Sequence, residues 1–123
     1  MSLFSSVDTV ILRVRRLEEA TSWYVKHLGL EARFVDPASR LAVLATGGAT
    51  SLTLWELAPG ETPAPAGSAS AFPILATRDA DAAHAALAAS GVDVEDVREG
   101  GGVRYFGFRD PDGNRIEACQ LLG

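Results

Sequence analysis

Glu117 is the residue of this sequence best placed to do chemistry. It lies within residues 115–120, a segment near the end of the chain that is typical of a strand. A carboxylate buried among apolar groups has a raised pKa and can act as a general base. A carboxylate paired with an arginine stays ionised instead and serves the structure. The sequence leaves both interpretations of Glu117 open.

The other reactive residue types favour structural roles. Cys119 is the only cysteine, so no intrachain disulfide can form, and its setting is typical of a terminal strand. His27 lies near a predicted helix end, where a cation favours the helix dipole, and His84 lies within a predicted helix, where a packed histidine is favoured over a metal ligand. No pattern resembles a Ser/His/Asp or Cys/His arrangement. Residues 110–113, Asp-Pro-Asp-Gly, fit a type I turn better than a calcium loop.

The elements that must position these residues occur twice along the chain. Residues 7–56 predict a strand, a helix ended by a glycine, and three strands, and residues 71–120 repeat this order with two strands or more. Thr9 aligns with Phe72, and Leu54 aligns with Glu117. A unit of about fifty residues cannot bury its apolar face alone. We therefore expect the two copies to pack on each other, with a ligand site between them.

Periodicity and turn residues place the individual elements within one domain, 1–123. This domain consists of a first module, 7–57, an extended linker, 58–70, and a second module, 71–121. The linker is rich in proline and glycine. The predicted helices are 17–28, closed by Gly29, and 80–90, capped by Asp79. The predicted strands are 7–14, 30–35, 41–45, 51–57, 72–77, 92–97, 103–109 and 115–120.

Composition excludes several classes of protein. The apolar content of 47% and charged content of 22% are ordinary for a soluble globular domain. A net charge of −5 argues against nucleic-acid binding, and no apolar run is long enough for a membrane span. The first residues do not have the pattern of a signal peptide, and the single cysteine fits a reducing compartment. We therefore expect a cytoplasmic protein.

Two stretches carry a family resemblance. The first resembles the opening of vicinal oxygen chelate proteins. It comprises residues 7–14, Val-Asp-Thr-Val-Ile-Leu-Arg-Val, followed by Trp23-Tyr24 and by His-Leu-Gly-Leu at 27–30. Residues 107–117, Gly-Phe-Arg-Asp-Pro-Asp-Gly-Asn-Arg-Ile-Glu, resemble their closing motif. This superfamily includes glyoxalase I, extradiol dioxygenases and bleomycin-binding proteins. The resemblance implies an α+β fold of two βαβββ modules, whose curved mixed sheets enclose a central cavity, and a homodimer.

The resemblance also implies where metal-dependent members hold their ion. Their four ligand positions match Thr9, Leu54, Phe72 and Glu117, and only Glu117 is a good ligand. Glu56 could replace Leu54 if the fourth strand were misread by two residues, but no histidine would be gained. The sequence therefore predicts no metal and no cofactor, with a divalent metal at Glu117 as the alternative.

Alternation along the strands predicts a cavity lined by apolar groups and a few charges, as is usual for small-molecule sites. Arg13 matches an arginine that grips a substrate carboxylate in glyoxalase I, and its alternative is a salt bridge to Glu117 or Glu56. Trp55 is expected to pack under a helix, on the side opposite to Leu54. Tyr105 and Phe106 are further candidates for ligand contact. The predicted cavity-facing residues are Thr9, Ile11, Arg13, Leu52, Leu54, Glu56, Phe72, Ile74, Arg115, Glu117 and Cys119.

The leading hypothesis is a metal-free member of this superfamily that binds a small organic molecule, either anionic or antibiotic-like. The alternative is an enzyme of the lyase, isomerase or dioxygenase type that uses Glu117 as base or as metal ligand. A third interpretation is a dimeric scaffold whose cavity is filled by its own side chains.

Overall fold

The computed structural model describes residues 2–65 and 70–123, and the chain divides into two compact units, Met1–Pro63 and Ala64–Gly123. The boundary between the units falls inside the predicted linker 58–70. The described part of that linker contains no helix or strand, and its residues 66–69 lie outside the described residues. No helix in the described residues is long and apolar enough to cross a membrane.

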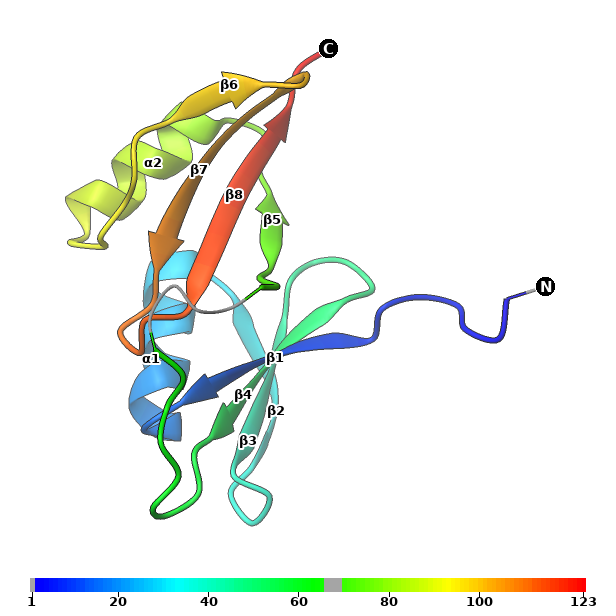
Figure 1. Cartoon of the computed structure of the whole chain (residues 1–123), viewed down its shortest axis with the longest axis vertical. Coiled ribbons are helices and arrows are strands. Elements are labelled where there is room, and N and C mark those ends of the chain that lie inside the picture. Colours follow the sequence, from blue (N-terminus) through cyan, green and yellow to red (C-terminus); the bar gives the residue numbers. More distant parts are fainter. Residues whose placement is uncertain (1, 66–69) are drawn as a thin grey trace. The chain divides into compact units, whose positions relative to one another are not determined.

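The first unit is a four-stranded mixed sheet with one helix (Figure 1). The strand order is β1-β4-β3-β2, in which β1 and β4 are parallel and the other neighbouring pairs are antiparallel. The helix ends as predicted, because Gly29 has a left-handed backbone with φ of 68°. The elements are β1 (Thr9–Val14), α1 (Leu17–Leu28), β2 (Glu31–Asp36), β3 (Leu41–Ala45) and β4 (Ser51–Glu56).

The second unit repeats this topology with the strand order β5-β8-β7-β6, so the two βαβββ modules and the α+β class are as predicted. The Asp79 carboxylate accepts a hydrogen bond of 3.0 Å from the Ala82 amide and caps α2, also as predicted. The elements are β5 (Ile74–Ala76), α2 (Ala80–Ala89), β6 (Arg98–Gly100), β7 (Val103–Arg109) and β8 (Arg115–Leu121).

The predicted strand 92–97 is wrong. This segment pairs with the sheet only through an isolated bridge between Val94 and Phe108, and the strand proper begins at Arg98. Val92 and Val94 look like alternating strand residues, but Val92 instead contributes a buried side chain just after the helix. Exposed residues then form the short edge strand β6.

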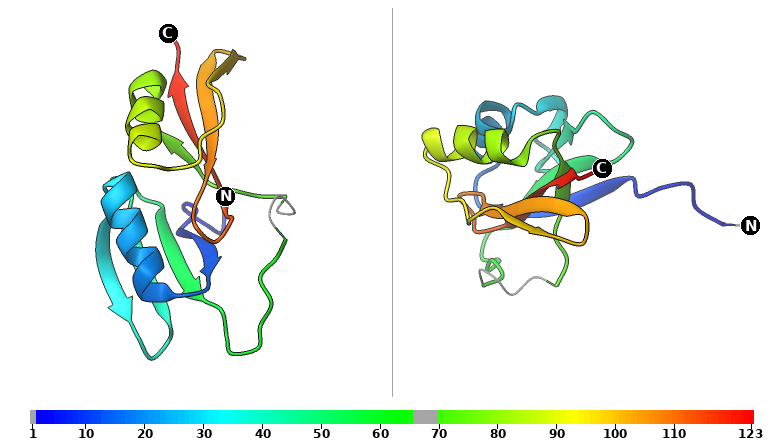
Figure 2. Two further views of the ribbon diagram at one scale, coloured as in Figure 1. Left: turned by 90° about the vertical axis from the view of Figure 1, so that its left-hand side faces the viewer. Right: turned by 90° about the horizontal axis from the view of Figure 1, so that it is seen from above.

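One face of each sheet is covered by its own helix, and this is where the core lies (Figure 2). In the first unit Leu12 and Val14 of β1 are buried on the side of α1, together with Tyr24 of that helix. In the second unit Phe106, Ile116 and Ala118 are buried on the side of α2. The alanine-rich sequence of α2 favours close approach to its sheet, because its side chains are short. We call the face opposite the helix in each unit the first open face and the second open face.

Candidate functional site

The first open face is set by the register of β1 on β4. Residues that are directly paired on neighbouring strands have side chains on the same face. Thr9 pairs with Ser51, Ile11 with Thr53, and Arg13 with Trp55, so these six residues share the face opposite the helix. Ile11 and Trp55 are about half exposed there, as is Phe34 of β2, which pairs with Val43. This face combines apolar and aromatic side chains with polar groups.

Three hydroxyl groups form a cluster on this face. The Thr9 and Thr53 oxygens lie 2.7 Å apart, and the Ser51 hydroxyl donates to Thr9 Oγ1 at 2.8 Å. The Thr9 hydroxyl also donates to the Ser51 carbonyl at 3.1 Å. The sequence identified Thr9 but not Thr53, which is the hydroxyl nearest to it. Thr9 and Ser51, which are half-buried, can offer neutral hydrogen-bonding groups to a ligand, whereas Thr53 is 6% exposed and supports them from below.

The prediction that Leu52, Leu54 and Glu56 of β4 lie on the same face of the sheet as Thr9 is wrong. Leu52, Leu54 and Glu56 pair with Val10, Leu12 and Val14, and so lie on the side of α1 rather than with Thr9. Leu54 is 0% exposed and belongs to the core. The physical reason is that the helix-covered face takes the more apolar half of the strand. Trp55, expected under a helix, therefore lies on the open face.

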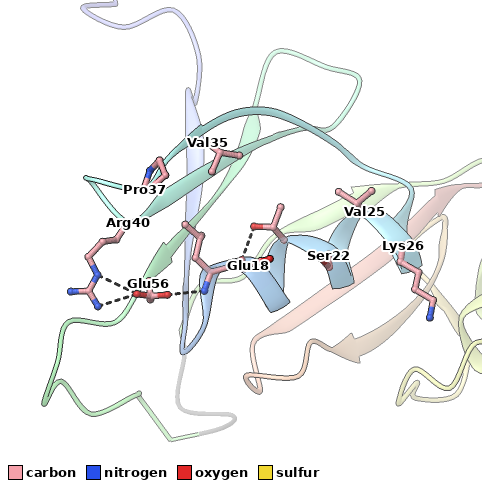
Figure 3. A pocket seen from close by; sticks show the side chains of 10 residues that line it. Glu18, Ser22, Val25, Lys26, Val35, Pro37, Arg40 and Glu56 are labelled. Atoms are coloured by element: carbon pink, nitrogen blue, oxygen red, sulfur yellow. Dashed lines mark hydrogen bonds and ion pairs between the residues drawn. The ribbon is translucent and has the colours of Figure 1, made fainter.

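Glu56 has a structural role at the start of α1 (Figure 3). Its carboxylate accepts from the Leu17 amide at 2.8 Å and from the Arg40 guanidinium at 3.1 Å. These bonds, first that from Leu17 and then that from Arg40, lower the pKa of Glu56. Arg40 reaches Glu56 from a left-handed backbone with φ of 63°. Glu56 thus replaces the missing side-chain cap of Arg16, and it does not join Arg13 on the open face.

Arg13 is held between an aromatic ring and a carboxylate. Its guanidinium carbon lies 4.0 Å from the centre of the Trp55 ring. Both terminal nitrogens donate to Glu61, at 2.9 and 2.8 Å. The salt-bridge interpretation of Arg13 is therefore right in kind, but the partner is neither Glu117 nor Glu56. Glu61 lies in the predicted linker, and periodicity gives no signal for a residue outside the strands.

The second open face gathers the predicted residues of the second module. Ile74 pairs with Glu117, and Ala76 with Cys119, which also pairs with Tyr105. The ring of Phe72 lies 5.3 Å from the guanidinium carbon of Arg115. Phe106 is on the opposite face, where it is 1% exposed and meets the ring of His84, so its predicted ligand contact is wrong.

Two carboxylates share the Arg115 guanidinium. Arg115 donates to Glu117 at 2.7 Å and to both oxygens of Glu95, at 2.9 and 3.1 Å. These bonds, first those to Glu95 and then that to Glu117, raise the pKa of Arg115, and the bonds from Arg115 lower the pKa of Glu95. The Glu117 side chain is 14% exposed. This geometry favours the ion-paired interpretation of Glu117 over the general base.

Gly107 makes room for this ion-pair network. It pairs with Glu117 on the second open face, and a Cβ atom there would lie 2.6 Å from Arg115 Nη2 and 2.5 Å from Glu95 Oε1. Any side chain at this position would therefore require the Arg115 and Glu95 side chains to move. The glycine was part of the recognised closing motif, but its spatial reason is visible only in the structure.

The residues at the family's metal positions do not fit a metal. Leu54 and Phe72 have hydrocarbon side chains and offer no donor atom; Leu54 is also buried on the helix side, and the Phe72 ring lies near Arg115. Thr9 is engaged with other hydroxyl groups, and one oxygen of Glu117 is bonded to Arg115. Within residues 2–65 and 70–123, no three His, Cys, Asp or Glu side chains come together as a metal site would need.

A groove on the other side of the first sheet was not predicted (Figure 3). It has a volume of about 690 Å³ and runs between α1 and the β2–β3 turn. Apolar side chains of Leu17, Val25 and Val35 line it, and the Arg40–Glu56 pair closes one end. None of the residues that line this groove belongs to the first open face.

The fold and these motifs agree with a sequence model of the glyoxalase/bleomycin resistance protein/dioxygenase superfamily, which matches residues 6–118. Because that match takes in most of the chain, the protein belongs to this superfamily. No curated protein sequence matches the chain.

Solved structures give closer points of comparison. The chain is similar to TnmS3, an antibiotic binding protein from Streptomyces sp. CB03234, with 28% identity over 98% of this chain and 99% of that chain and a TM-score of 0.81. A superfamily member from Sphaerobacter thermophilus DSM 20745 shares 27% identity over 97% and 99% of the two chains, with a TM-score of 0.79. TioX from Micromonospora sp. ML1 shares 25% identity over 96% and 100%, with a TM-score of 0.75.

Proposed function

We propose that this protein binds a small, mostly apolar, antibiotic-like organic molecule without the help of a metal. The observation that carries the proposal is the make-up of the first open face. Ile11, Phe34 and Trp55 are 52%, 55% and 42% exposed there, beside the hydroxyl cluster of Thr9, Ser51 and Thr53. Apolar surface with a few placed polar groups is the usual lining of small-molecule sites. The full-length similarity to an antibiotic binding protein supports the same function.

Proton transfer by Glu117 is the weaker alternative. A general base needs a carboxylate oxygen that can reach the proton of a substrate. Glu117 Oε2 is bonded to Arg115, and Arg115 is itself fixed by Glu95 and by the ring of Phe72. We therefore assign Glu117 and Arg115 to shaping the second open face, beside Tyr105, rather than to catalysis.

We also propose that the protein forms a homodimer. Large apolar side chains outside the first open face are left uncovered, including Val35 at 50% and Leu121 at 81% exposure. Such side chains are removed from water when a partner covers them, which favours association. A second copy of the chain is the partner that the family resemblance implies.

Ligand titration followed by two-dimensional NMR tests the binding function. We expect at least one compound of an antibiotic panel to shift the Ile11 methyl and Trp55 indole signals, and Trp55→Ala to weaken its binding by about tenfold or more, because a large aromatic contact is lost. The matched control is Val25→Ala, in the groove beside α1, which should leave the affinity unchanged.

The same titration after treatment with EDTA should give the same affinity. A stoichiometric metal that is lost in Glu117→Ala would contradict the metal-free part of the proposal. Shifts confined to Val25 and Val35 would move the site to the groove, and the absence of any binding compound would count against the function.

A further inference from the structure

We infer that Glu61 is a selectivity residue of the first open face: it occupies the guanidinium fork of Arg13 and so excludes ligands that would bind there through a carboxylate. The inference rests on the proposed function, since it names a class of ligand, the carboxylates, that the same face does not bind. Nothing in the strand pattern points to Glu61, which follows β4 in the chain.

Arg13 has the geometry of a ready anion site. Its Nε donates to the Trp55 carbonyl at 3.2 Å, and Nη2 also contacts the Glu56 carbonyl at 3.4 Å. The ring of Trp55 supports the guanidinium from one side. These contacts fix the orientation of the guanidinium, and a fixed guanidinium presents two parallel N–H groups that match a carboxylate.

Glu61 already satisfies this fork. Its two oxygens accept from Nη1 and Nη2, and Oε1 also accepts from the Ala58 amide at 2.8 Å. The hydrogen bond from Arg13 lowers the pKa of Glu61, so it is present as the carboxylate that the fork prefers. Because Glu61 is part of the same chain, it does not lose the translational and rotational freedom that a free carboxylate loses on binding.

The position remains accessible to solvent, so occupancy rather than burial keeps other anions out. The Arg13 and Glu61 side chains are 31% and 37% exposed. Glu61 belongs to no strand or helix, so replacing it leaves the sheet hydrogen bonds intact. The second open face has the same combination, with Arg115 between the Phe72 ring and the Glu95 carboxylate. Each open face therefore holds an arginine whose charge is balanced by a carboxylate of the same unit.

Two probes of nearly the same shape, one anionic and one neutral, test the inference. The probes are 2-naphthoate and neutral 2-naphthamide, titrated into the full chain and followed by the Trp55 indole NMR signal. Glu61→Gln keeps an acceptor for Ala58, and Glu61→Ala removes the side chain entirely. Glu99→Gln is the charge-matched control, because Glu99 pairs with Arg104 at 3.5 Å in the second unit.

We expect both Glu61 variants to bind 2-naphthoate about tenfold or more tightly than the unmodified protein, since a charge-assisted pair becomes available. Affinity for 2-naphthamide should change by less than about twofold, within the range of weak surface effects. The gain should disappear in the double variant Arg13→Gln/Glu61→Gln. An equal gain in Glu99→Gln, or no gain in either Glu61 variant, would overturn the inference. A Glu61 that only anchors the chain would lower thermal stability on substitution without changing the naphthoate affinity.

The outcomes separate this inference from the proposed function. A panel compound that binds at Trp55, together with unchanged naphthoate binding in the Glu61 variants, refutes the selectivity role alone. A naphthoate gain in those variants, with no panel compound bound by the unmodified protein, refutes the proposed function alone.

Discussion

At the scale of single residues, the two faces of β4 have different roles: one packs in the core, and the other is assigned to ligand binding. Leu54 and Trp55 are adjacent in sequence, yet one is wholly buried against α1 and the other is 42% exposed on the opposite face. Alternation shows that the two residues differ in facing, but it does not say which one faces the helix. The pairing of Leu54 with the buried Leu12 decides it.

Truncation of one residue on each face of this strand pair tests the assignment. Leu54→Ala should lower the free energy of unfolding by about 2–5 kcal/mol, because it opens a cavity in the core. Ile11→Ala removes a side chain of similar size from the open face and should cost less than about 1 kcal/mol. Urea unfolding of both variants provides the comparison, and equal losses would contradict the assigned faces.

At the scale of elements, helix α1 depends on a residue from a strand. Arg16 at its N-cap makes no side-chain capping bond, and Glu56 of β4 supplies the acceptor for the Leu17 amide instead. The first turn of a helix has amide groups without partners inside the helix, so an acceptor there is stabilising. The acceptor also ties the helix start to the sheet.

This capping should make stability depend on acid pH. The pKa of Glu56 in the folded protein lies below its ordinary value of 4.5, so its contribution is fully present above that value. The contribution is lost as the pH falls through the lowered pKa. Glu56→Gln should therefore have a lower urea midpoint near neutral pH, and the two proteins should converge in acid.

Glu19→Gln is the control for this experiment. The carboxylate of Glu19 also belongs to α1, but it pairs with Arg16 on the exposed side of the helix, at 3.1 Å. Its neutralisation should change the urea midpoint little at any pH, as is usual for exposed ion pairs. A gap between Glu56→Gln and the unmodified protein that stays constant into acid would contradict the role of Glu56.

The elements were easier to predict from sequence than the site. Helix α1 follows from its apolar spacing and Gly29, and α2 from Asp79, because these signals are local. The site depends on pairing between distant segments: Thr53 reaches Thr9 only through the parallel register, and Glu61 reaches Arg13 from outside any strand. The second module was predicted better, since Ile74, Arg115 and Glu117 do share an open face.

At the scale of the whole molecule, the remaining question is how the exposed apolar residues are covered. The chain has a mass of 12.9 kDa and a net charge of −5, which favours solubility. Uncovered side chains such as Leu121 nevertheless remain on the described surface. We expect sedimentation equilibrium to give a mass of about twice 12.9 kDa at the concentrations used for ligand titration. A mass of one chain throughout that range would contradict the homodimer.

The pairing of β1 with β4 also governs when the protein can fold during synthesis. The parallel partner of Thr9 is Ser51, so the first sheet cannot close until nearly the whole first unit has left the ribosome. Every strand of that sheet lies within Met1–Pro63, so none of these strands pairs with a strand of the second unit. Domains generally form in the order in which they are made. All the strand partners that the first open face needs, and the Glu61 partner of Arg13, have thus been synthesised before the second half of the chain is complete.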